Sequence, residues 1–158
     1  MKAKTLLLSL ALFLVTGVVC FASTGAQMGT WKLNEAKSKL ALGAAKNTTV
    51  VYEASGDSVK VTVDGTDSEG KPAHNEWTGK FDGKDYPVTG DPDSDARSYK
   101  LVHPTDDRML ELTVKKGGKV TLTGRIEVSV DGKTRTVTTN GTDAQGKKFK
   151  SISVYDKQ

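Results

Sequence analysis

One stretch decides the fold that we expect for this chain: Val61-Thr62-Val63-Asp64-Gly65-Thr66-Asp67-Ser68-Glu69-Gly70-Lys71. It returns 76 residues later as Val137-Thr138-Thr139-Asn140-Gly141-Thr142-Asp143-Ala144-Gln145-Gly146-Lys147, with seven of the eleven positions identical. Each copy begins with alternating β-branched residues, a pattern typical of a half-buried strand. Each then enters a turn rich in Gly, Asp and Asn, whose side chains bond to the backbone within turns. The repetition predicts antiparallel strands joined by short turns.

The two-residue period extends outward from both copies, from residue 47 nearly to the end of the chain. It predicts about ten strands, the last two over 134–139 and 148–155. Between strands, Asp82-Gly83-Lys84 has the composition of a tight hairpin turn. Gly124 lies inside the longest alternation, where a bend or bulge is expected.

The segment before residue 47 carries a different pattern. Trp31 is expected to lie inside on a first strand. Asn34 then fits the N-cap of a short helical turn over 35–42, because its side-chain oxygen can accept from free amides of the first turn. Gly43 is expected to end that turn.

Ten strands with one short helix near the start predict an all-β protein. Connections this short join neighbouring strands, so the sheet is antiparallel. No helix is available to cover its apolar face, so the sheet closes into a barrel of about 8–10 strands or folds into a sandwich. We favour the barrel, because a sandwich usually needs longer crossing connections and only 90–95 and 34–46 could serve.

The first 22 residues have the composition of a bacterial-type secretory signal peptide. Lys2 and Lys4 precede an apolar run over 6–19, which is short for a membrane span, and small residues follow. Cleavage is expected after Ala22 or as late as Ala26. The alternatives are a retained single-helix anchor and lipidation of Cys20, for which the preceding residues fit poorly.

Residues 28–158 are therefore expected to form a single β-barrel domain in the periplasm or outside the cell, with no transmembrane span after processing. That domain holds no cysteine, so its stability rests on its core rather than on disulfides. Loss of Lys2 and Lys4 lowers the formal net charge from +4 to about +2, too little to indicate a nucleic-acid partner. We expect a monomer without a cofactor.

Candidate sites for chemistry are sparse. His74 and Glu76 share one strand face and could supply part of a metal site, but His103 is the one other histidine, and solvent-facing alternation explains them more simply. The acidic loop over 91–95 lacks the glycine and glutamate of an EF-hand. No nucleophile or phosphate-loop motif is present, so we expect no enzyme activity.

Gly29-Thr30-Trp31 resembles the opening motif of lipocalins, in which the Trp closes the barrel floor. The mature chain is also similar to small exported bacterial proteins described as lipocalin-like, of uncharacterised function. Two lipocalin features, a mid-chain Thr-Asp-Tyr-like motif and a helix after the last strand, are missing. In the related fatty-acid-binding proteins, a late Arg-x-Tyr holds the ligand carboxylate, and here Ser153 stands where that Arg would be. The resemblance implies a lipocalin-like or fatty-acid-binding-protein-like barrel more than a particular ligand.

The leading hypothesis is a non-enzymatic barrel that binds a small apolar or amphipathic molecule in its interior. Large inward-facing residues would bury that lipophilic partner. Seven residues are predicted to line the cavity: Trp31, Tyr52, Val61, Trp77, Phe81, Leu112 and Leu122. The alternative is an envelope structural or interaction protein with a solid core, which uses its outer face or the lysines near 115–119 and 147–150.

Overall fold

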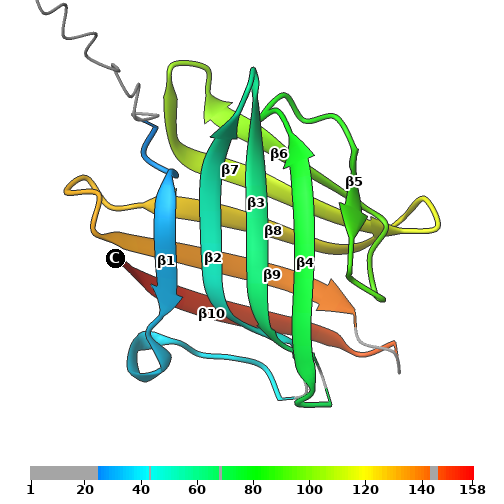
Figure 1. Ribbon diagram of the computed structural model, residues 1–158. Helices are drawn as coiled ribbons and strands as arrows, with labels where there is room; N and C mark the ends of the chain where they lie inside the picture. Colours follow the sequence, from blue (N-terminus) through cyan, green and yellow to red (C-terminus); the bar gives the residue numbers. More distant parts are fainter. Residues whose placement is uncertain (1–24, 43, 68, 143–145) are drawn as a thin grey trace, which may run out of the picture.

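The structure is a computed structural model that describes residues 25–42, 44–67, 69–142 and 146–158. Ten antiparallel strands form one closed barrel in which each strand pairs with its neighbours in sequence and β1 pairs with β10 (Figure 1). The strands are β1 (Gly29–Leu33), β2 (Lys46–Ser55), β3 (Ser58–Thr66), β4 (Pro72–Gly79), β5 (Tyr86–Thr89), β6 (Ala96–His103), β7 (Asp106–Lys116), β8 (Lys119–Val128), β9 (Thr134–Thr142) and β10 (Lys148–Lys157). The predicted all-β antiparallel barrel is confirmed, and the sandwich is not formed.

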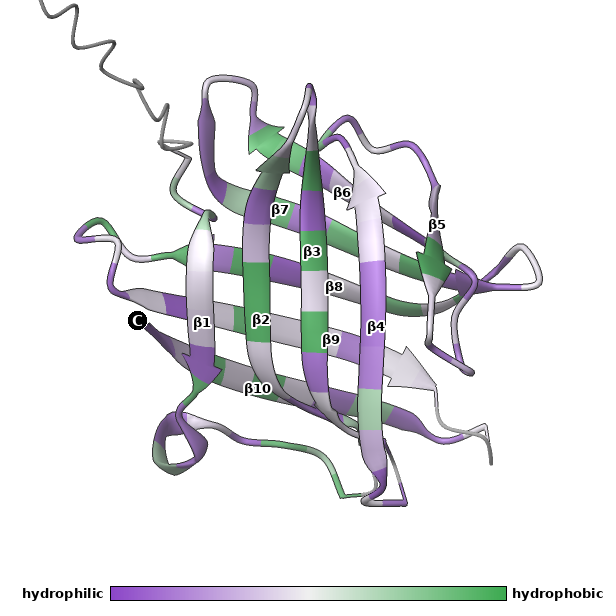
Figure 2. Ribbon diagram, in the orientation of Figure 1, coloured by the Kyte–Doolittle hydropathy of each residue, from purple (hydrophilic) through white to green (hydrophobic). Residues whose placement is uncertain are grey.

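The barrel is flattened into two layers. Figure 1 shows β1 to β4 crossing steeply in front of β7 to β10, with β5 at the edge between the layers. Figure 2 shows apolar bands alternating with polar ones along single strands such as β3, as the two-residue period predicts. One face of every strand therefore points into a shared interior.

The expected helical turn forms but is shorter than predicted. It is one 3-10 turn, η1 (Glu35–Lys37), and the side chain of its N-cap Asn34 accepts a hydrogen bond from the Lys37 amide at 3.2 Å. The turn ends there because Lys39 exchanges two backbone hydrogen bonds with Ile152 of β10, at 2.7 and 2.8 Å. The predicted stop at Gly43 lies outside the described residues.

The hairpin predicted at Asp82-Gly83-Lys84 forms, because β4 and β5 pair antiparallel on either side of this segment, but the connection is longer than a tight turn. A local turn exists, since the Asp82 carboxylate accepts from the Lys84 amide at 3.0 Å. The connecting segment also pairs with β6: Asp82 bridges to Lys100, and the Gly83 amide donates to the Tyr99 carbonyl at 2.9 Å. Turn composition alone does not reveal which strand the turn will lie against.

The irregularity expected at Gly124 lies elsewhere. Gly124 pairs regularly with Leu112 and Thr139, whereas the β7–β8 register shifts between Val114 and Lys115. Gly124 has a packing role instead, because a Cβ there would lie 3.0 Å from the Thr138 carbonyl oxygen. A glycine inside a strand can thus mark close packing as well as a bulge.

The floor segment, residues 25–28, closes one end of the barrel under Trp31. The indole N–H of Trp31 donates to the Gln27 carbonyl at 2.8 Å, and the Gln27 side-chain amide donates to the Asp107 carbonyl at 2.9 Å. The Ala26 amide bonds the Asp107 carboxylate at 3.0 Å. Trp31 and Gln27 are both 0% exposed, so this end is sealed.

The opposite end of the interior is open. The register of β7 to β10 groups their inward-facing residues into rows that run across the strands. Burial decreases from the row beside the floor segment to the row at the other end of the strands. The row nearest the floor holds Tyr155, Arg135 and Val128, all buried. The last row is partly exposed over four strands; it comprises Phe149, Gly141, Leu122 and Val114. These four residues define the open end of the barrel.

Removing the floor tryptophan should destabilise the barrel strongly. Trp31→Ala deletes a fully buried indole and is expected to cost about 3–5 kcal/mol of unfolding free energy, measured by urea denaturation. Leu42→Ala is the control, because Leu42 is fully exposed at 104%. Equal urea midpoints for the two variants would show that Trp31 does not hold the floor.

Candidate functional site in the barrel interior

A buried arginine lies at the centre of the candidate site. Arg135 of β9 is 3% exposed, and its Nη2 donates to the Tyr52 hydroxyl of β2 at 2.6 Å. Its guanidinium carbon lies 4.9 Å from the Tyr52 ring centroid and 5.4 Å from that of Tyr155. The arginine therefore bridges the two layers of the barrel, held by tyrosines on both sides.

The two tyrosines stay neutral at physiological pH. Burial raises the pKa of Tyr52 well above its ordinary value of 10.0, although the Arg135 charge acts in the opposite direction. Burial likewise raises the pKa of Tyr155, again against Arg135. Neither phenol supplies a negative charge to the guanidinium. The ring of Tyr99 meets that of Tyr52 edge to face, with centroids 6.3 Å apart.

A second buried arginine is neutralised. Arg97 of β6 is 8% exposed; its Nη2 donates to the Asn75 side-chain oxygen at 3.2 Å and lies 3.8 Å from the Asp91 carboxylate. Asp91 also accepts from the Ser94 hydroxyl at 2.6 Å. The acidic loop over 91–95 is thus tied to the barrel by its own turn and by Arg97, as oxygens of a structural loop rather than of an ion site.

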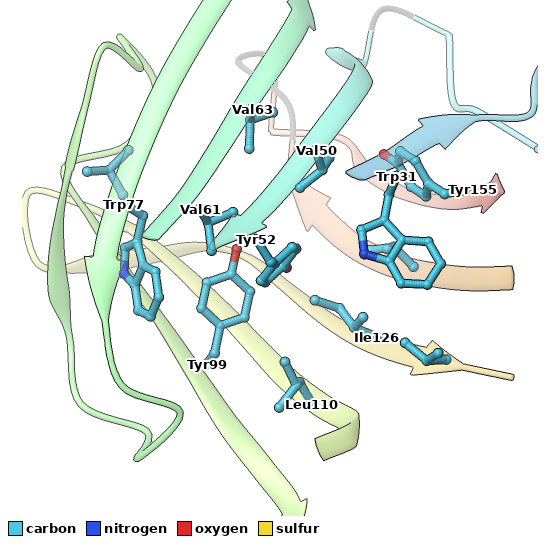
Figure 3. Close-up of a cluster of buried hydrophobic side chains, with 13 residues drawn as sticks. Trp31, Val50, Tyr52, Val61, Val63, Trp77, Tyr99, Leu110, Ile126 and Tyr155 are labelled. Atoms are coloured by element: carbon cyan, nitrogen blue, oxygen red, sulfur yellow. The ribbon is translucent and has the colours of Figure 1, made fainter. Parts of the chain in front are cut away.

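An aromatic cluster links this interior to the surface. Tyr99 meets the rings of Trp77, Phe81 and Tyr52 edge to face, with centroids 4.7, 5.9 and 6.3 Å apart. Figure 3 shows Tyr52, Tyr99 and Trp77 converging beneath Val61. Phe81 remains partly exposed, so one side of the cluster touches solvent.

The structure brings together some of the seven predicted lining residues. Tyr52, Trp77 and Phe81 belong to the aromatic cluster, and Val61 pairs with both Tyr52 and Trp77 in register. Leu112 pairs with Tyr99 and is partly buried. Two lie apart: Trp31 is at the floor and Leu122 at the open end. Contact of these residues with a ligand stays a prediction.

Sequence reasoning missed Arg97 and Arg135. Arg135 starts a strand whose inward positions continue with Val137 and Thr139, so the alternation did place it on the inner face. The outward-facing Thr136 and Thr138 are the same residue type as the inward-facing Thr139, so the pattern does not indicate which face is buried. Charged residues are rarely fully buried, which hides such a position from composition.

His74 and Glu76 lie on the surface of the barrel, as their alternation along the strand predicts. The His74 Nδ1 lies 2.6 Å from an Asp64 oxygen, and its Nε2 lies 3.9 Å from a Glu76 oxygen, with all three side chains about half exposed. Among the residues that the structure describes, no three His, Cys, Asp or Glu side chains gather as metal ligands. These are exposed polar contacts, which contribute little to stability.

Two shallow depressions accompany the barrel. One of about 300 Å³ lies at the open end, and it is lined by Val120, Thr121, Leu122, Thr123, Asn140, Gly141, Thr142 and Lys148. The other, of about 290 Å³, lies near the floor and is lined by Asp106, Arg108, Met109, Glu127, Val128, Ser129 and Val130. Most of the lining of the first depression lies on outward-facing positions of β8 and β9, such as Thr121, Thr123 and Asn140, so it is a surface feature of this end of the barrel.

Comparison with known proteins places the chain in no family. No family model matches it, and no curated protein does. Among solved structures it is similar to a redesigned beta barrel, mFAP1, bound to DFHBI, at 16% identity and a TM-score of 0.41, over 84% of this chain and 95% of that chain. The lipocalin-like family that the first strand resembles is therefore not established by these comparisons. Within the described ranges, no helix has the length and apolarity needed to span a membrane.

The buried tyrosines predict an alkaline limit to stability. Because the pKa of folded Tyr52 lies above that of the unfolded chain, the folded state keeps its proton above pH 10 while the unfolded state loses it, and stability falls as pH rises past 10. Tyr52→Phe should flatten this decline by up to about 1.4 kcal/mol per pH unit, measured by urea unfolding between about pH 9 and 11. An unchanged slope in the variant would contradict the burial of this phenol.

Proposed function

We propose that this protein is an exported, lipocalin-like barrel that binds a small amphipathic molecule in its interior. One observation carries the proposal: the interior is sealed at the Trp31 floor, whereas inward-facing apolar side chains stay partly exposed at the other end. An amphipathic ligand entering at that end would cover these side chains. Closed barrels of this size can hold one small ligand.

The side chains next to the open end are small. The row next to it contains Ser151, Thr139 and Gly124 on three adjacent strands, directly paired in register. An apolar tail lying across this row would remove Leu112 and Leu122 from water. Burial of that kind stabilises a complex by about 25 cal/mol per Å² of apolar area.

The lipocalin-like assignment is supported by the position of Trp31. The Gly-x-Trp of the first strand lies at the closed base, where the resemblance to lipocalins implies it should be. The meander order of the strands agrees with the same architecture. The apolar leader supports export to the periplasm or beyond.

A larger side chain in the small-residue row should weaken binding. Purified protein is titrated with N-phenyl-1-naphthylamine, a neutral lipophilic fluorophore, while tryptophan emission is recorded. Thr139→Leu fills the inner face and is expected to weaken binding about tenfold or more, since the added side chain occupies the ligand's space. Thr138→Leu is the matched control, because it adds the same atoms on the outer face of the same strand. Fluorophore binding that is absent from the unaltered protein, or equal in both variants, would overturn the proposal.

The contacts of the floor segment also predict where the signal peptide is cleaved. Cleavage after Ala26 would delete the bonds of the Ala26 amide to Asp107 and of the Gly25 carbonyl to the Met28 amide, and would place a charged amine on buried Gln27. We therefore expect cleavage after Ala22. The intact mass of the exported protein should correspond to a chain starting at Ser23, and a chain starting at Gln27 would contradict this.

A further inference from the structure

The depression at the open end of the barrel lies on the outer face of β8, β9 and β10, which run side by side in the rear layer (Figure 1). Its volume is about 300 Å³. Three hydroxyl groups and one amide line it, from Thr121, Thr123, Thr142 and Asn140, and none of the described lining residues is acidic. Hydroxyl and amide groups both donate and accept hydrogen bonds. The depression therefore suits a polar ligand that is rich in hydroxyl groups.

A β-bulge shapes one margin of this depression. The pairs between β7 and β8 pass from Val114–Leu122 directly to Lys115–Val120. Thr121 is therefore an extra residue of β8, and the alternation of β8 reverses there. As a result Val120 shares a face with Lys115, and its side chain is 55% exposed. Bulges often re-aim a side chain next to a functional site, and this one places an apolar group beside polar ones.

Two lysines of β10 add positive charge to the same face. Lys148 lines the depression, and Lys150 pairs in register with Asn140. Both lysines are exposed, and among the described residues neither forms an ion pair. Lysine in the front layer differs, since Lys60 of β3 lies 2.7 Å from the Glu76 carboxylate. The charge of Lys148 and Lys150 is therefore available to an anion.

The polar surface continues beyond the depression. Thr113, Thr123, Asn140 and Lys150 pair successively in register across β7, β8, β9 and β10. Neighbouring strands lie about 4.8 Å apart, so this row spans about 14 Å. The row is long enough to contact more than one sugar unit of a polymer.

The composition of this face separates the classes of anionic partner. Surfaces that bind single-stranded nucleic acid combine basic with aromatic side chains, and no aromatic residue is among the described residues that line the depression. A membrane-binding surface gathers exposed apolar side chains. Of the three large apolar side chains exposed in the described ranges, Leu42, Val120 and Val130, only Val120 lines the depression.

We propose that this outer face binds an acidic polysaccharide, with one charged sugar unit in the depression. Lys148 and Lys150 bind the carboxylate groups of the polymer. Thr123 and Asn140 form hydrogen bonds with its hydroxyl groups, and Val120 packs against the C–H groups of the sugar ring. This site is separate from the barrel interior and does not depend on a ligand there.

Binding of the purified protein to polygalacturonate is measured by isothermal titration at low salt, with dextran as the neutral polysaccharide. Polygalacturonate should bind and dextran should not. Lys148→Gln combined with Lys150→Gln is expected to weaken binding about tenfold. The matched control, Lys32→Gln combined with Lys133→Gln, removes the same charge from two exposed positions that do not line the depression and should leave the affinity unchanged.

A second pair of variants separates a built site from simple charge attraction. Thr123→Val removes one hydroxyl group at nearly constant volume and charge, and should weaken binding about fivefold. Thr136→Val is its control, because Thr136 lies on the outer face of β9 but outside the depression.

Four results would overturn the proposal: no binding of polygalacturonate, equally tight binding of dextran, equal affinities within either pair of variants, or tighter binding to phosphatidylglycerol vesicles than to polygalacturonate. The last result would assign the face to a membrane surface. None of them bears on the interior, because titration with N-phenyl-1-naphthylamine tests that space separately.

Discussion

Closure of the barrel by β1 and β10 is the constraint on which the rest of the structure depends. Three register pairs join them, Trp31 with Lys157, Lys32 with Asp156 and Leu33 with Tyr155. Backbone bonds from Asn34 to Val154 and from Gln158 to Thr30, at 2.8 and 3.0 Å, extend the seam. A closed sheet has no exposed edge and turns one face of all ten strands toward a single interior. Opening this seam would expose Trp31 and the floor beneath it.

The interior of the barrel contains two buried arginines, Arg97 and Arg135, whose surroundings differ. A core selected for stability alone gains little from a buried guanidinium, because apolar residues of similar volume usually do as well or better. Arg97 has a structural reason, since it holds the 91–95 loop through Asp91 and Asn75. Arg135 holds Tyr52, and its Nε finds no hydrogen-bond partner among the described residues. Departures of this kind from stable packing concentrate at functional sites.

Local sequence patterns were reliable where the responsible interaction is local. Asn34 caps η1 through a contact three residues away, and Asp67 accepts from the amides of Glu69 and Lys71 within its own turn, at 2.8 and 2.9 Å. The same patterns were misleading where a distant strand intervened. The connection around Asp82 is lengthened and lies against β6, the helical turn ends early because Lys39 joins β10, and Gly124 packs closely against β9. In each of these cases the deciding partner is remote in sequence.

The sequence by itself determined the all-β class, the antiparallel order and most strand positions, because a period of two and short Gly- and Asp-rich turns act over a few residues. It also pointed to Trp31, Tyr52, Trp77 and Phe81 as large interior side chains. Only the tertiary structure decided that the sheet closes with Trp31 at a sealed floor, that one end stays open, and that Arg135 is buried beside Tyr52, 83 residues away in the chain. Closure depends on strand twist and register accumulated over the whole sheet. The residues of a threonine-rich strand such as β9 do not by themselves indicate which face will be inside.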